Sequence, residues 1–154
     1  MQDTDNGQPH ILPYACLVPF ATGTLKGASK AWPGFPTLCR QLVPELPVLL
    51  MPGPGPETIQ ARTDYPDAQT LAGVPLDVYA ALLAHSAVAV ANDTGPGHLA
   101  AAVGARLVSV LGPTDASRYR ALGPHVTLIQ HHPWPEVDTV LQQVHQAIAA
   151  TRQG

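Results

Sequence analysis

The chain has 154 residues, of which 45% are hydrophobic and 12% are charged, and its formal net charge at pH 7 is −3. This length and composition fit one domain with an ordinary hydrophobic core. The weak negative charge excludes a basic patch for nucleic acid and a polybasic face for anionic lipid, so neither partner is expected.

The N-terminal residues 1–13 are polar and lack the apolar core of a secretory signal. No apolar run in the chain approaches the ~20 residues that a membrane span needs. We therefore expect a flexible N-terminal segment over residues 1–13, one domain over residues 14–154, no transmembrane segment and a cytoplasmic location. The two cysteines, Cys16 and Cys39, are too few for a zinc motif and are expected to be buried free thiols.

The first half of the domain predicts two strands, each followed by a helix. Residues 14–20 form an apolar run typical of a buried strand, and a polar loop follows over residues 21–33. This loop exceeds the ~2–6 residues usual between a strand and its helix, and long loops are often functional. Apolar residues then recur at helical spacing at Phe35, Leu38, Cys39 and Leu42. A second strand is expected at residues 48–51, before a Gly/Pro turn and a short helix near Glu57.

The second half continues the alternation. After a turn at Leu71-Ala72-Gly73, a helical stripe comprises Leu76, Tyr79, Leu82 and Leu83. Strands are expected at residues 87–91, 106–111 and 126–129, and Thr114 or Asp115 can cap another short helix. From residue 135 an amphipathic helix is indicated by Val137, Val140, Leu141, Val144 and Ile148.

Strands that alternate with helices predict an α/β fold, a Rossmann-like parallel sheet with helices on both faces. This architecture hosts many chemistries, so the fold alone predicts no function.

The most informative segment is residues 88–102, where an apolar strand leads through a Gly/Pro turn into a helix of small residues. A helix start offers unpaired N–H groups and a positive dipole end, so a phosphate beside Thr94, Gly95 and Gly97 would find donors there. The two glycines would also allow close approach to the backbone. The alternative is a structural turn in which Asp93 or Thr94 is only an N-cap and His98 only a first-turn residue.

Several motifs together resemble one family, the lipopolysaccharide heptosyltransferases of glycosyltransferase family 9. The loop ends in Lys30-Ala31-Trp32-Pro33, and Glu57 follows the Gly-rich turn after the second strand. Residues 92–102 read Asn-Asp-Thr-Gly-Pro-Gly-His-Leu-Ala-Ala-Ala, close to the signature of that family, and Leu111-Gly112-Pro113-Thr114 is similar to its next turn. The resemblance extends from Tyr14 to the end of the chain.

The resemblance implies the C-terminal, donor-binding half of a two-domain GT-B fold. Thr22 and Lys30 would face the donor diphosphate, with Thr24 and Lys26 as alternatives, and Glu57 would hold the ribose hydroxyls. The diphosphate and sugar would be held by Asp93, Thr94, Gly95, Gly97 and His98. These roles suit the residue types, since a carboxylate accepts ribose O–H groups and an ammonium pairs with phosphate.

Each of these residues also has a purely structural interpretation. Lys30 could be a solvated lysine with its stem on Trp32, and Glu57 could simply favour the start of its helix. His98 could be a core histidine, and Trp32 is expected to pack the loop rather than contact sugar. No carboxylate or cysteine stands at ligand spacing from His131 and His132, so no metal site is expected.

The function implied is binding of an ADP-heptose-like donor by one half of an inverting glycosyltransferase of lipopolysaccharide core biosynthesis. No cofactor or metal is expected, and the general base would lie outside this chain, on another domain or on another chain, such as one that supplies a GT-B N-terminal domain. Self-association and peripheral contact with the inner membrane are further expectations. The alternative is a non-catalytic module, or a subunit of a split enzyme, that binds a nucleotide or nucleotide sugar.

Overall fold

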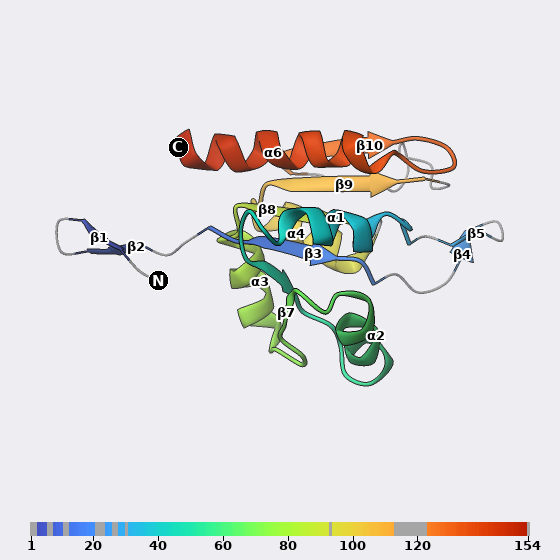
Figure 1. Cartoon of the computed structure of the whole chain (residues 1–154), viewed down its shortest axis with the longest axis horizontal. Coiled ribbons are helices and arrows are strands. Elements are labelled where there is room, and N and C mark those ends of the chain that lie inside the picture. The colour runs from blue at the N-terminus through green and yellow to red at the C-terminus, as the bar shows by residue number, and fades with distance from the viewer. Residues whose placement is uncertain are drawn as a thin grey trace.

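The centre of the molecule is a parallel sheet of six strands in the order β10-β9-β8-β3-β6-β7 (Figure 1). The structure, a computed structural model, describes residues 3–5, 8–10, 13–20, 24–25, 28–29, 31–92, 94–112 and 123–153. The strands are β3 (Ala15–Val18), β6 (Val48–Leu50), β7 (Gln69–Thr70), β8 (Val88–Ala91), β9 (Leu107–Leu111) and β10 (Val126–Gln130). Every neighbouring pair is parallel.

The strand order reverses once. Ranked along the chain, the six strands read 3-2-1-4-5-6 from β7 to β10, which is the Rossmann order. The reversal lies between β3 and β8, which pair directly although they are far apart in the chain. In sheets of this kind, ligands bind outside the carboxyl ends of the strands at the reversal.

Helices cover both faces of the sheet. Side chains on each strand alternate between the two faces, and both faces are apolar, so both must be buried. Ala15 and Leu17 of β3 join one buried cluster, and Cys16 and Val18 join the other. The first cluster contains residues of α1 (Phe35–Leu42) and α6 (Val137–Gln153). The second contains residues of α3 (Leu76–Ala84) and α4 (Gly95–Ala102). The Rossmann-like sheet with helices on both faces is therefore confirmed.

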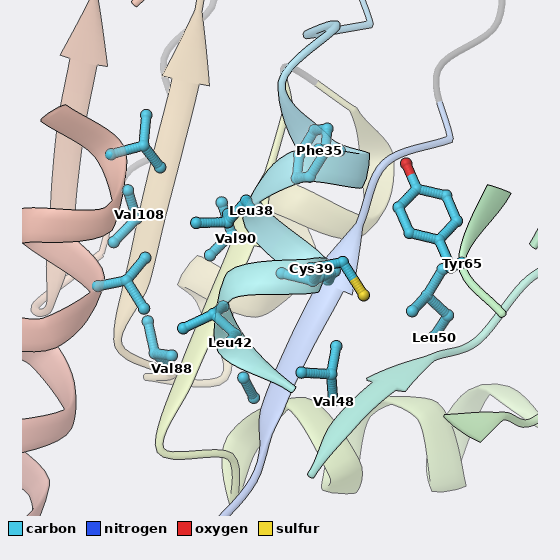
Figure 2. Close-up of a cluster of buried hydrophobic side chains, with 14 of the residues drawn as sticks. Phe35, Leu38, Cys39, Leu42, Val48, Leu50, Tyr65, Val88, Val90 and Val108 are labelled. Carbon is cyan, nitrogen blue, oxygen red and sulfur yellow. The ribbon is translucent and has the colours of Figure 1, made fainter. Parts of the chain in front are cut away.

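The amphipathic patterns of the first and last helices are also confirmed. Phe35, Leu38, Cys39 and Leu42 are all buried, and Figure 2 shows α1 lying over β3 and β8 with Leu38 near Val90. Val140, Val144 and Ile148 of α6 are buried as well. Both cysteines are buried free thiols, as predicted.

Other predictions need correction. Leu76 opens the predicted stripe of α3 but is 73% exposed, whereas Leu83 is fully buried. The reason is that Leu76 is the first residue of the helix, and only later residues reach the buried cluster. The edge strand β7 was not predicted, because it has two residues, Gln69 and Thr70, with no apolar run. The predicted helix at Thr114 or Asp115 lies outside the described residues.

Two short antiparallel pairs stand outside the main sheet. The pair of β1 (Asp3–Asp5) and β2 (Gln8–His10) lies within the expected flexible segment, where no element was predicted. The pair of β4 (Thr24–Leu25) and β5 (Ala28–Ser29) lies within the long polar loop after β3. The remaining helix, α2 (Pro56–Asp64), follows β6. None of the helices in the described ranges is both long and apolar enough to cross a membrane.

Candidate functional site

The predicted site residues follow three neighbouring strands of the sheet. Glu57 follows β6, Thr22 and Lys30 follow β3, and residues 93–98 follow β8. Since β6, β3 and β8 are adjacent and parallel, their carboxyl ends meet at one edge, on both sides of the reversal of strand order. Thr22, Lys30, the alternative Lys26 and Asp93 lie outside the described residues, and of Thr24 only the strand assignment is described.

Thr94 is the N-cap of α4. Its backbone is extended, with φ −144° and ψ 164°, and its Oγ1 accepts the N–H of Gly97 at 3.2 Å. Its carbonyl accepts the N–H of His98 at 3.1 Å, and Pro96 has no N–H to offer. In the described part of the chain, the N–H groups left without a partner at this helix start are therefore those of Thr94 and Gly95.

The two glycines of the motif have different surroundings. A Cβ built on Gly95 would meet no atom within 4 Å, so the space beside this helix start is open. A Cβ built on Gly97 would lie 2.9 Å from the backbone oxygen of Asn92 and 3.2 Å from the Cβ of Ala91. Gly97 is buried against β8, so its glycine is required by packing, and the room for a ligand lies at Gly95.

Glu57 stands in the first turn of α2, half-buried at the end of β6. Its Oε1 accepts the N–H of Gly53 at 3.0 Å, while Oε2 has no partner among the described residues. The pKa of Tyr79 is raised to about 12, mainly by burial and to a smaller degree by the nearby Cys16 and by the Glu57 carboxylate. The carboxylate is thus held at the turn by one oxygen, with acceptor capacity left on the other.

The structure reveals a polar connection that was not predicted. The side chain of Asn92, which is 1% exposed, accepts the backbone N–H of Trp32 at 2.9 Å and donates to the carbonyl of Pro19 at 3.3 Å. Asn92 opens the motif after β8, but its neighbours in sequence gave no signal that it bridges two distant segments. Such a bridge depends on β3 and β8 being adjacent, which periodicity does not show.

Trp32 and His98, which both had a purely structural interpretation, differ in burial. Trp32 is 3% exposed and its Nε1–H donates to the carbonyl of Pro135 at 3.0 Å, so the prediction that it packs the loop is confirmed. His98 is exposed, so it is not a core histidine. Among the described ranges, no three His, Cys, Asp or Glu residues gather as a metal ligand set, and His131 and His132 are both exposed.

The sequence matches the pattern of one family over residues 1–148, described as glycosyltransferase family 9 (heptosyltransferase). No curated protein matches the chain.

Solved structures with the same fold include E. coli ADP-heptose lipopolysaccharide heptosyltransferase II, which is 23% identical with a TM-score of 0.73. The match covers 92% of this chain and 48% of that one. E. coli heptosyltransferase WaaC with ADP is 23% identical, with a TM-score of 0.75 and coverage of 87% and 44%. WaaC with ADP-2-deoxy-2-fluoro heptose gives 24% identity, a TM-score of 0.68 and coverage of 90% and 44%. The chain therefore spans about half the length of these structures, as expected for one half of a GT-B fold.

Proposed function

This chain belongs to glycosyltransferase family 9, and on that premise we propose that it is the half of an inverting glycosyltransferase that binds an ADP-heptose-like donor. The acceptor in this proposal is a lipopolysaccharide core, and the protein works in the cytoplasm with peripheral contact to the inner membrane. Two similar structures were solved with ADP and with an ADP-heptose analogue, which supports an ADP-linked donor.

The observation that carries the proposal is the position of Glu57 and of the start of α4. They follow β6 and β8, the two strands that flank β3, at the edge where the strand order reverses. A nucleotide laid across this edge would place its ribose near a carboxylate and its diphosphate near a helix start.

The chemistry proposed for each group follows from its geometry. The free oxygen of Glu57 and the remaining lone pair of Oε1 would accept ribose hydroxyls. The N–H groups of Thr94 and Gly95, with the dipole of α4, would stabilise the negative charge that develops on the departing diphosphate. Lys30 would add a positive charge from the loop after β3, and Asp93 and His98 would contact diphosphate or sugar. In this proposal the transfer uses no metal.

Inverting transfer also needs a base to take the proton of the acceptor hydroxyl. We place that base outside these 154 residues, on another domain or on another chain, including a second copy of this one. The match covers about half of each similar structure, and the proposal assigns the base to the half of the fold that these residues do not match.

The second candidate is a nucleotide-sugar binding subunit without transferase activity of its own. A neighbouring reading frame that encodes the other half of a GT-B fold would support a split enzyme. Sugar transfer by the co-expressed pair, but not by either chain alone, would establish it.

Calorimetric titration of the purified chain with ADP tests the proposal, with UDP and GDP as controls. We expect saturable binding of ADP, weaker binding of the other two nucleotides and loss of ADP affinity in Glu57→Ala. If no nucleotide binds at millimolar concentration, the chain does not hold a donor by itself and the proposal fails for the isolated chain.

A further inference from the structure

We propose that Asn92 is a positioning residue that fixes the loop between β3 and α1 against the start of α4. Its role rests on the proposed function, because it would bring the diphosphate contacts of two separate loops into one site. Asn92 itself would not touch the ligand, since its side chain is buried and its polar atoms are occupied by Pro19 and Trp32.

The hydrogen bonds of Asn92 hold both ends of one loop. Pro19 directly follows β3, and Trp32 stands three residues before α1. The carbonyl oxygen of the Asn92 side chain takes the N–H of Trp32 and its NH₂ group donates to Pro19, so one amide joins the outgoing and returning segments. Between these anchors the structure describes β4 and β5 (Figure 1). In sequence, Thr22 and Lys30 also lie between them. We refer to Pro19, Trp32 and Asn92 as the Asn92 clamp.

The backbone of Asn92 belongs to the other loop. It lies between the last residue of β8, Ala91, and the segment that leads into α4. Its carbonyl oxygen is so near Gly97 that a Cβ there would come within 2.9 Å. Asn92 therefore lies against α4 with its main chain and is hydrogen-bonded to the β3–α1 loop through its side chain.

The returning end of the loop has a second tether. The Trp32 indole donates to the carbonyl of Pro135 and packs edge-on against Phe35, with ring centroids 5.1 Å apart. A Cβ on Gly34 would overlap the Trp32 ring, so the chain at this point is closely packed. These contacts give the backbone N–H of Trp32 a defined position. The bond from this N–H to Asn92 then holds the returning end of the loop beside the start of α4.

The clamp lies where strand order reverses, which separates it from ordinary core polar groups. Ser86 is also buried, but its Oγ donates to Leu83 three residues away, at the amino end of β8. Asn92 instead joins segments 73 and 60 residues distant in the chain. Removing its amide would release two buried backbone groups at the edge where the ligand is proposed to bind.

The test compares Asn92→Leu, which keeps a similar volume without the amide, with Ser86→Ala as a matched buried control. Each purified variant is titrated with ADP and with adenosine at a temperature where it is fully folded. We expect Asn92→Leu to weaken ADP binding at least tenfold and leave adenosine binding unchanged, because only the diphosphate uses the two loops. Ser86→Ala should bind both ligands as the wild type does. Asn92→Ala gives the same comparison if leucine prevents folding.

A second measurement needs no ligand. The exchange of the Trp32 amide proton, followed by NMR, should accelerate at least tenfold in Asn92→Leu, while that of Ala89 within the sheet stays unchanged. Unaltered ADP affinity in a folded Asn92 variant would overturn the positioning role. If the wild type binds no ADP, the proposed function fails, and the exchange of Trp32 alone decides the clamp: acceleration supports it and an unchanged rate rejects it.

Discussion

Glu57 closes the turn between β6 and α2, because its Oε1 accepts the N–H of Gly53 at 3.0 Å. The same turn is closed from the next residue, since the Thr58 hydroxyl donates to the carbonyl of Gly53 at 2.7 Å. Glu57 therefore has a structural bond in addition to the ribose contact proposed for it. Any test of the ribose role has to separate the two.

We expect Glu57→Ala to weaken binding of ADP far more than binding of pyrophosphate, because only ADP has a ribose. Glu57→Gln is the matched variant, since its amide oxygen can still accept from Gly53 but it carries no charge. Calorimetric titration of both variants with both ligands gives the comparison. Equal losses of affinity for ADP and pyrophosphate would contradict the ribose role. If the variants lose stability but keep their affinity for both ligands, the role of Glu57 is limited to its bond in the turn.

Gly95 and Gly97 should respond oppositely to substitution. Gly95→Val should fold normally, because a Cβ there meets open space, and should abolish nucleotide binding by blocking approach to the helix start. Gly97→Ala should lower the free energy of unfolding by about 1–3 kcal/mol, because its Cβ would press on the backbone of Asn92. Denaturation and ADP titration of both variants check this. Unchanged ADP affinity in Gly95→Val would remove this helix start from the site.

Thr94→Ala should lower the free energy of unfolding by about 1 kcal/mol, because it removes the N-cap acceptor of the Gly97 N–H. Thr94→Ser keeps a hydroxyl in place and should recover most of that stability. Urea denaturation of the two variants measures the difference. Equal stability of Ala and Ser at this position would mean that the cap contributes little.

Of the two lysines in the loop after β3, we expect Lys30→Ala to weaken ADP and pyrophosphate binding more than Lys26→Ala does. Lys30 stands two residues before Trp32, whose backbone the clamp holds, whereas Lys26 is further from this anchor. The difference should shrink at high salt, since salt screens the attraction between an ammonium and a phosphate. Titration at two ionic strengths measures both effects, and a larger loss in Lys26→Ala would reverse the assignment.

Stability should fall as the pH rises above about 9. Burial raises the pKa of the Cys16 thiol from 9.0 to about 12, so between these values the folded protein keeps a proton that the unfolded chain loses. Tyr14 and Tyr79 act in the same direction, each raised by burial from 10.0 to about 12. By linkage, stability decreases with pH wherever the folded state binds more protons. Denaturation at pH 8, 10 and 11 checks this, and a shallower decline in Cys16→Ala would assign part of it to the thiol.

Local patterns in the sequence were sufficient for much of this fold. The runs that became β3 and β8 are short and wholly apolar, as strands buried on both faces require, and β9 differs from them only by the buried Ser109. The helical spacing in α1 and α6 predicted their buried faces, because the period of a helix is a local property. An N-cap at Asp93 or Thr94 was one of the two interpretations of this turn, and the structure assigns the cap to Thr94, whose bond to Gly97 spans three residues.

Tertiary structure alone decided what meets at the site. β3 pairs with β8, and Asn92 bonds to segments 60 and 73 residues away in the chain. These contacts form only when the sheet assembles and helices bury both of its faces. The opposite surroundings of Gly95 and Gly97 likewise depend on where α4 rests on β8, although both residues are glycines of one motif. Such contacts join residues with no periodic relation in the chain, and their energy exists only when the whole sheet has assembled.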